Sequence, residues 1–287
     1  MGNRKIAVVG ANGFIGKSVS NYFELREESV QKITRAITSQ RSFFLEKDFD
    51  QITNLIWLAS SVNPLSAETH PEMVVTEIEE WESFLNYAKY LKNLRQTIIV
   101  SSGGCVYTDP TLPHSENSLA SGTNAYGRFK LEQERLLVES GLNFAIVRAS
   151  NVYGPNQLPG KGQGVIAEWI DSALKRKPLV VLGATDNYRD FIYVADLSEL
   201  IWNVITSGFS GIINAGSGDK TELTKVISII QSNFDYEIEI SYLSSRSIDR
   251  KGSYLDITKA KELLGWIPQT SLEEGIKETI FRHELTQ

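Results

Sequence analysis

The stretch Lys5-Ile-Ala-Val-Val-Gly-Ala-Asn-Gly-Phe-Ile-Gly16 decides the fold of this chain. An apolar run with strand character passes directly into three glycines spaced three apart, at positions 10, 13 and 16. Glycines at this spacing let the chain turn sharply, bring its backbone close to a pyrophosphate and pack the next helix against the sheet. The stretch therefore predicts a strand, a phosphate-binding turn and a helix whose first N–H groups face a dinucleotide.

The overall composition sets broad limits. A chain of 287 residues with 41% hydrophobic residues is long enough to bury a full core. A net charge of −6 without a basic run makes nucleic acid an unexpected partner. Cys105 is the only cysteine, which excludes an internal disulfide and suits a reducing compartment. We expect no leader and no membrane partner, and hence a cytoplasmic protein, because no apolar run approaches the ~20 residues that span a bilayer.

The order of apolar patterns predicts the fold class. Strand-like runs at 5–9, 31–37, 54–60, 97–101 and 143–149 alternate with helical patterns at 14–25, 74–93 and 126–140. This alternation predicts a doubly wound parallel α/β sheet. The stretch between the second and third runs is too short for a helix, a strand and a second helix, so the sheet is predicted to be shortened there. Further elements are expected at 163–176, 179–182, 196–207, 211–214, 221–233 and 258–264.

A change in composition along the sequence also predicts two lobes. After Asn151 the chain becomes rich in Gly- and Pro-containing loops. We therefore expect residues 1–150 to form a dinucleotide-binding domain and 151–287 to form mainly a smaller, substrate-binding lobe. Segments near 183–215 are expected to return to the first domain.

A second chemical signal is Tyr126-Gly-Arg-Phe-Lys130, which places a phenol and an ammonium one helical turn apart on the same face. An ordinary phenol has a pKa of about 10, so a tyrosine base at neutral pH needs about 4 kcal/mol of phenolate stabilisation. A lysine and the positive charge of an oxidised nicotinamide supply charge of the right sign. About twenty residues upstream, the strand Ile98-Ile-Val-Ser-Ser102 ends in hydroxyls, where open α/β sheets bind ligands.

These three features, in this order, resemble the extended short-chain dehydrogenase/reductase family, in its nucleotide-sugar epimerase, dehydratase and reductase branch. The resemblance continues through almost the whole chain. It includes Trp57-Leu-Ala-Ser60, Arg148-Ala-Ser-Asn-Val-Tyr-Gly-Pro155, Tyr188-Arg-Asp-Phe-Ile-Tyr-Val-Ala-Asp196, Asn214-Ala-Gly-Ser-Gly218 and Leu264-Gly-Trp-Ile-Pro268. It implies a Rossmann-type fold, a nucleotide-diphosphate sugar as substrate, and a homodimer formed through the helices at 74–93 and 126–140.

The resemblance also implies roles for individual residues. Tyr126 would exchange a proton with a sugar hydroxyl, while Lys130 would hold the cofactor ribose and lower the pKa of Tyr126. The family's assisting Ser or Thr falls on Gly103, so the hydroxyl role moves to Ser102, to Ser101 or to the Cys105 thiol; for Cys105, a small buried side chain that fills space is the alternative. Ser102 and Cys105 are the named candidates. No metal ligands are assigned, and the remaining cofactor contacts are expected from Gly10, Asn12, Gly13, Phe14, Ile15, Gly16, Leu58, Ala59 and Ser60.

Three polar residues are implied as diphosphate ligands by the same resemblance. Arg189 and Arg246 match family arginines, and Asn151 matches a side chain that donates to the same group. A guanidinium is well shaped for the oxygens of a diphosphate. For Arg246 a surface salt bridge is the alternative, because the Pro and Gly of the family loop are Ser247 and Ile248 here.

The choice between NAD and NADP depends on the acidic residue that is missing near the end of the second predicted strand. Relatives that prefer NAD usually have an acidic residue at the end of the second strand, but residues 29–45 contain no Asp or Glu. Arg35 lies close to that position and suits a 2′-phosphate, although it can equally be a solvated side chain. Both NAD and NADP remain open.

Three functions fit the motifs. The first is an NAD(P)-dependent nucleotide-sugar 4-epimerase that acts through a transient 4-keto sugar, and it is favoured by the Ser-Ser-Gly-Gly-x-Val-Tyr and Tyr-Gly-Pro-Asn-Gln patterns. The second is an NADPH-dependent reductase of a 4-keto-6-deoxy nucleotide sugar, supported by Arg35 and Cys105. The third is a non-catalytic dinucleotide sensor, which Gly103 favours and the intact Tyr126 and Lys130 oppose.

Overall fold

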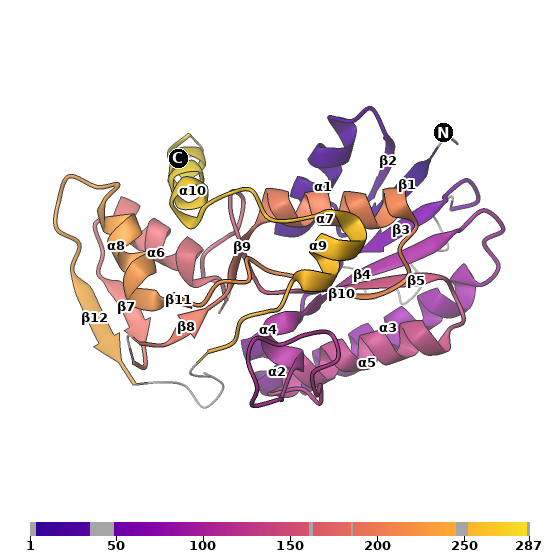
Figure 1. Cartoon of the computed structure of the whole chain (residues 1–287), viewed down its shortest axis with the longest axis horizontal. Helices are drawn as coiled ribbons and strands as arrows, with labels where there is room; N and C mark the ends of the chain where they lie inside the picture. Colours follow the sequence, from indigo (N-terminus) through magenta and orange to yellow (C-terminus); the bar gives the residue numbers. More distant parts are fainter. Residues whose placement is uncertain (1–3, 35–48, 161–162, 185, 245–251, 286–287) are drawn as a thin grey trace.

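The computed structural model describes residues 4–34, 49–160, 163–184, 186–244 and 252–285. A six-stranded sheet lies at its centre, in the order β10-β5-β4-β3-β1-β2 (Figure 1). Every neighbouring pair in this sheet is parallel. The doubly wound parallel fold predicted from the sequence is thereby confirmed. The strands are β1 (Lys5–Val9), β2 (Ser29–Ile33), β3 (Asn54–Trp57), β4 (Gln96–Ser102), β5 (Phe144–Ala149) and β10 (Gly211–Ala215).

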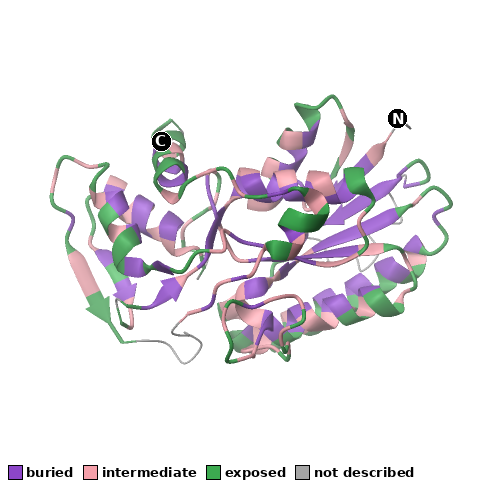
Figure 2. Cartoon of the chain, viewed as in Figure 1, coloured by how far each residue is buried: buried purple, intermediate pink, exposed green. Residues whose placement is uncertain are grey.

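Helices cover both faces of this sheet, because side chains alternate between the faces along each strand. Along β1, Ile6 and Val8 enter one apolar core while Ala7 and Val9 enter the other. The first core packs against α1 (Phe14–Glu24), α7 (Val194–Ser207) and α9 (Thr258–Leu264), and the second against α3 (Pro71–Ala88) and α5 (Ala125–Glu139). Figure 2 shows the strands buried between helices whose outer faces are exposed.

Late segments of the chain complete the early core. β10 pairs with β5, from Gly211 beside Ala145 to Ala215 beside Ala149. Trp266 is 1% exposed, belongs to the same apolar cluster as Ile6 and Val8, and donates its indole N–H to the Asp196 carbonyl at 3.1 Å. Residues after 150 are therefore part of the sheet and of its core.

A third apolar cluster, which includes the buried Trp169, Ile230 and Ile280, holds the smaller lobe together. β6 (Asn151–Tyr153) and β9 (Phe191–Tyr193) form a parallel pair between this lobe and the large sheet. The lobe contains α6 (Val165–Leu174), β7 (Leu179–Leu182), β8 (Tyr188–Arg189), β11 (Thr221–Glu222), α8 (Leu223–Gln231), β12 (Ile240–Leu243) and α10 (Leu272–Glu284).

Several predicted boundaries are wrong. β2 begins two residues before the predicted run 31–37, whose last residues lie outside the described ones. β3 ends at Trp57 rather than at residue 60, because the chain leaves the sheet to pack under the turn after β1. The helix predicted over 74–93 is α3, which begins and ends earlier. The helices α2 (Pro64–Thr69), α4 (Gly103–Val106) and α10 were not predicted.

Candidate active site

The turn after β1 requires two of its glycines. Gly10 has φ +89°, and a Cβ there would lie 2.6 Å from the backbone nitrogen of Ala59. A Cβ on Gly16 would lie 2.1 Å from the Gly10 carbonyl oxygen, so the helix can approach the turn only without a side chain. Gly13 is the N-cap of α1 and provides no side-chain cap, which leaves the first helical N–H groups without an intrahelical partner. This is a cradle for a phosphate group.

The predicted cofactor residues gather at one edge of the sheet. β1 has β2 on one side and β3 on the other, so the direction of winding reverses at β1, and ligands of open α/β sheets bind beyond such a point. The turn after β3 lies against the turn after β1, and the Leu58 N–H donates to the Val9 carbonyl at 2.8 Å. The structure thereby brings together the residues named from β1, α1 and β3, which are Gly10, Asn12, Gly13, Phe14, Ile15, Gly16, Leu58, Ala59 and Ser60.

Tyr126 and Lys130 lie in the first turns of α5, which is capped by the side chain of Asn124 accepting from the Gly127 N–H at 2.8 Å. Tyr126 is partly buried and Lys130 is 8% exposed. The Lys130 Nζ lies 5.7 Å from the centroid of the Tyr126 ring, as the shared helix face predicts. It donates to the Val100 carbonyl at 3.3 Å and to Gln133 Oε1 at 3.1 Å. The lysine is therefore held against the end of β4.

Burial changes the pKa values of both residues of this pair. Burial lowers the pKa of Lys130 to about 8, and the carboxylates of Glu77 and Glu134 oppose this change. Burial raises the pKa of the Tyr126 phenol, and Cys105 and Glu77 raise it further. Burial therefore dominates the Tyr126 pKa in the protein alone, and the lowering of this pKa by Lys130 together with an oxidised nicotinamide stays a prediction. A tyrosine base at this position needs an additional positive charge.

The end of β4 presents the candidate hydroxyls and the thiol. Ser102 is partly buried, while the buried Ser101 Oγ has no hydrogen-bond partner among the described residues. Cys105 is partly exposed on α4, and its Sγ accepts from the Asn124 side chain at 3.9 Å. The Cys105 backbone lies directly against the first turn of α5, since a Cβ on Gly127 would lie 2.2 Å from the Cys105 carbonyl oxygen. Cys105 thus lies on a helix that packs against the helical turn of Tyr126, and its role stays a prediction.

The missing family hydroxyl has a packing explanation. A Cβ on Gly103 would lie 2.6 Å from Leu255 Cδ1 and 3.1 Å from the Arg148 carbonyl oxygen. Leu255 is 1% exposed, so its side chain cannot leave this place without opening the core. At Gly104, by contrast, the nearest atom to a Cβ would be Asn151 Nδ2 at 4.0 Å. The buried leucine thus occupies the space of the absent Ser or Thr.

The substrate candidates are only partly brought together. Asn151 begins β6 beside α4, and its Nδ2 donates to the Asp190 carbonyl at 2.9 Å. Arg189 directly precedes Asp190 in the sequence, and its guanidinium donates to the Tyr188 carbonyl at 2.7 Å. Arg35 and Arg246 lie outside the described residues, so the argument that bases NADP on Arg35 stays a prediction.

Sequence reasoning missed Asp190, which lies inside one of the quoted motifs. Its carboxylate is 1% exposed, and burial raises its pKa. It accepts from the N–H of Ser217 at 2.7 Å and from that of Leu255 at 3.1 Å, and also from the hydroxyls of Ser150 and Ser217. This carboxylate joins the start of the smaller lobe to the loop after β10 and to the segment that carries Leu255.

We expect Asp190→Asn to destabilise the protein by about 3 kcal/mol, because one acceptor oxygen becomes an NH2 group that faces N–H donors. Asp219→Asn, an exposed site on the same loop, is the matched control and should change little. Urea unfolding of both variants measures the difference. Equal unfolding midpoints would show that the Asp190 carboxylate is not holding these segments.

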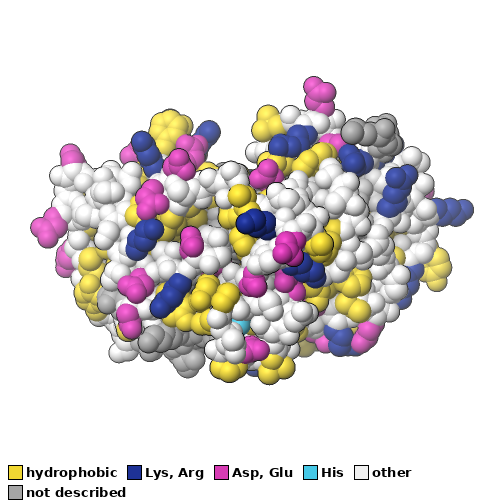
Figure 3. Space-filling view, viewed as in Figure 1, with side chains coloured by type: hydrophobic (Ala, Val, Ile, Leu, Met, Phe, Trp, Pro, Cys, Tyr) yellow, Lys and Arg dark blue, Asp and Glu magenta, His cyan; other side chains and the backbone are white. Residues whose placement is uncertain are grey.

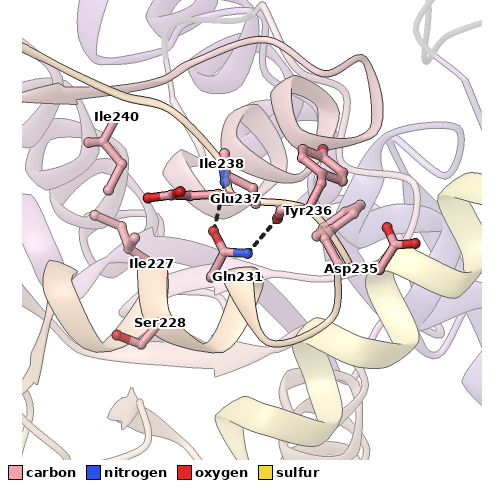
Figure 4. Close-up of a pocket in the computed structure, with 9 residues that line it drawn as sticks. Ile227, Ser228, Gln231, Asp235, Tyr236, Glu237, Ile238 and Ile240 are labelled. Carbon is pink, nitrogen blue, oxygen red and sulfur yellow. Dashed lines mark hydrogen bonds between the residues drawn. The ribbon is translucent and has the colours of Figure 1, made fainter.

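A hollow of about 460 Å³ lies in the smaller lobe, away from these residues (Figure 4). It lies beside α8, where the Gln231 side chain donates to the Tyr236 carbonyl at 2.7 Å and accepts from the Ile238 N–H at 2.8 Å. These bonds fix the loop that forms its wall. None of the predicted site residues lines it. Figure 3 shows basic and acidic side chains interspersed over one face of the molecule, in keeping with the small net charge.

Comparison with known proteins decides the family. The profile of the NAD dependent epimerase/dehydratase family matches residues 6–216, which include the glycine turn, Tyr126 and Lys130. The chain belongs to this family. Enzymes of the NAD dependent epimerase/dehydratase family use a nicotinamide dinucleotide, so the predicted NAD or NADP cofactor and the predicted enzyme class are confirmed at this level.

Individual relatives agree with the family over nearly the full length. A protein of Methanocaldococcus jannaschii, provisionally described as a UDP-glucose 4-epimerase, is 29% identical over 96% of this chain and 97% of its own. The dTDP-4-dehydro-6-deoxyglucose reductase of Escherichia coli is 26% identical over 96% of each chain. The structure of Thermotoga maritima UDP-glucose 4-epimerase with UDP-glucose has a TM-score of 0.87 and 25% identity, covering 98% of this chain and 99% of that one.

Proposed function

We propose that this chain is a nucleotide-sugar 4-epimerase that acts through a transient 4-keto sugar. The observation that carries the proposal is the Tyr126–Lys130 pair, held beside the ends of β3 and β4 where the phosphate cradle of a nicotinamide dinucleotide also lies. The Thermotoga maritima UDP-glucose 4-epimerase and the Methanocaldococcus jannaschii protein that is provisionally described as one, which match nearly the whole chain, support it.

Each residue has a defined task in this reaction. The glycine turn and the N-terminus of α1 bind the pyrophosphate, and Lys130 donates to the ribose. Tyr126 removes the proton from the C4 hydroxyl of the sugar and later returns it. A nicotinamide dinucleotide held here would supply the hydride transfer, and its oxidised ring would bring the positive charge that Tyr126 needs, since burial raises the Tyr126 pKa.

Asn151 and Arg189 are proposed to hold the diphosphate of the substrate. Asn151 lies beside α4, next to the reaction site, and one N–H of its amide is already bonded to the Asp190 carbonyl. The second N–H of this amide is proposed to donate to a phosphate oxygen of the substrate. Three further features are also proposed. They are the division of the chain near residue 150, the cytoplasmic location, and a homodimer formed through the helices at 74–93 and 126–140.

A reductase of a 4-keto-6-deoxy nucleotide sugar is the second candidate, because the Escherichia coli relative is named as an enzyme of that type. The two functions differ in how they treat the cofactor. An epimerase regenerates its dinucleotide in each cycle, whereas a reductase consumes a reduced dinucleotide and must exchange it.

The test uses that difference. We expect freshly purified protein to release NAD on denaturation, detected by mass spectrometry, and to interconvert UDP-glucose and UDP-galactose without added cofactor, followed by NMR. An empty site, no interconversion of either sugar, and oxidation of added NADPH in the presence of a 4-keto-6-deoxy nucleotide sugar would replace the epimerase by the reductase. Retained NAD together with interconversion of a UDP-N-acetylhexosamine instead would keep the reaction and change the sugar.

A further inference from the structure

Glu77 is a buried carboxylate without an assigned role in the proposed reaction. It lies on α3 and is 4% exposed. Its two oxygens accept three hydrogen bonds from the turn after β3: from Ser60 Oγ at 2.8 Å, from the Ser61 N–H at 2.6 Å and from Ser61 Oγ at 2.7 Å. Hydrogen bonds to a carboxylate are among the strong ones in proteins, so Glu77 holds this turn in place.

The turn that Glu77 holds is a wall of the cofactor cradle. Ala59 leaves no room for a side chain on Gly10, so a displacement of the turn after β3 changes the space beside the turn after β1. Ser60 gives its hydroxyl proton to Glu77 and accepts from the Val62 N–H at 3.2 Å. Toward a ligand, this hydroxyl is therefore set up as an acceptor rather than as a donor.

The turn that Glu77 holds also packs against α5, because Val62 shares an apolar cluster with Phe129, against which Tyr126 packs. Glu77 raises the pKa of Lys130 against the effect of burial, and it also raises the pKa of Tyr126. Glu134 is the second acidic group that raises the pKa of Lys130, but it is already paired with Arg148 of β5, 2.6 Å away. Among the described residues, Cys105 on α4 also affects Tyr126, Glu68 of α2 accepts from the Ala125 N–H, and Glu80 is a second buried carboxylate on α3.

We propose that Glu77 is a positioning residue of this site, which holds the turn after β3 between the cofactor cradle and the helix that carries Tyr126 and Lys130. One carboxylate thus fixes a segment that contacts both the cradle and the reacting pair. The inference rests on the proposed roles of Lys130 and Tyr126.

The test is the pH dependence of reduced-cofactor binding, measured by nicotinamide fluorescence with NADH or NADPH, whichever binds more tightly. In the unaltered protein the charged Lys130 donates to the ribose, so affinity is highest below a pH of about 8 and falls as the pH rises through that value. In Glu77→Gln, which keeps the size but loses the charge, we expect this midpoint to fall by about one pH unit. The affinity should then fall about twofold at pH 7, where the charged fraction of Lys130 drops from about nine-tenths to about a half, and about tenfold at pH 9.

The control is Glu82→Gln, the same chemical change at an exposed position of the same helix, which should leave affinity and midpoint unchanged. Glu77→Asp keeps the charge and should keep the midpoint while weakening binding, because the shorter side chain cannot reach both serines. A Glu77→Gln protein that melts at a lower temperature but binds with unaltered affinity and midpoint would overturn the proposal.

A second variant and an assay without sugar complete the test. If Glu77→Gln does not fold, Ser61→Ala removes one hydroxyl donor and leaves the charge, so binding should weaken at an unchanged midpoint; unaltered affinity would overturn the positioning role. Because the assay contains no sugar, it fails or succeeds independently of the epimerase proposal. A protein without epimerase activity that still shows the shifted midpoint would refute the proposed function and keep the role of Glu77.

Discussion

Tyr126→Phe is expected to lower turnover about a thousandfold, the usual contribution of a general acid–base group. The change removes only the phenol oxygen. The ring keeps its packing beside Phe129, 6.1 Å between centroids, and Lys130 keeps its bonds to Val100 and Gln133. Cofactor affinity and the unfolding midpoint should therefore stay nearly unchanged, which separates a chemical effect from a structural one.

The measurement is the rate of sugar interconversion at saturating substrate, together with a cofactor titration and a thermal melt. Tyr90→Phe is the matched control, because Tyr90 is 83% exposed and lies outside the site. If Tyr126→Phe retains more than about a tenth of the activity, Tyr126 does not transfer the proton. The hydroxyls of β4 and the Cys105 thiol then become the candidates.

Gly127→Ala is expected to have the second large effect. A Cβ at this position would lie 2.2 Å from the Cys105 carbonyl oxygen and 2.9 Å from the carbonyl carbon of the same residue. Both are backbone atoms, so α5 must move away from α4. Tyr126 precedes Gly127 on this helix and would move with it. We expect a loss of about 3 kcal/mol in unfolding free energy and the loss of most activity.

Gly104→Ala is the matched control for stability, since its added methyl group meets its nearest neighbour only at 4.0 Å. Urea unfolding of the two variants compares one alanine that collides with backbone and one that enters open space. Similar unfolding midpoints for both would mean that α4 and α5 separate easily, and that Tyr126 is not held as tightly as the structure indicates.

The elements that were predicted correctly from sequence are those with local signals. The buried strands β1, β4 and β5 are short apolar runs, and the helices between them show a helical period. The helices α2 and α10 also had a signal that was not used. Each begins with a capping box, from Asn63 to Ser66 and from Ser271 to Glu274. The end of β3 had none, because it is set by contact with the distant Gly10.

The residues of the site likewise fall into those with a local sequence pattern and those that only the fold distinguishes. The glycine turn and the Tyr126–Lys130 pair are local patterns, and sequence spacing predicted them. Glu77 is one of several glutamates on an amphipathic helix, and only the fold distinguishes it, by bringing it to Ser60 and Ser61. The place of Leu255 against Gly103 joins residues that are far apart in the sequence, so no local pattern could have revealed it.

The return of late segments to the large sheet has a consequence for the newly made chain. A ribosome that has released only the first 150 residues has released a sheet without β10 and without α7 on its upper face. The apolar side chains of β1 on that face are then covered by α1 alone, and Trp266 joins them later still. The nascent protein must keep this surface from aggregating until most of the chain has emerged. A fragment cut near residue 150 would keep that exposed face permanently.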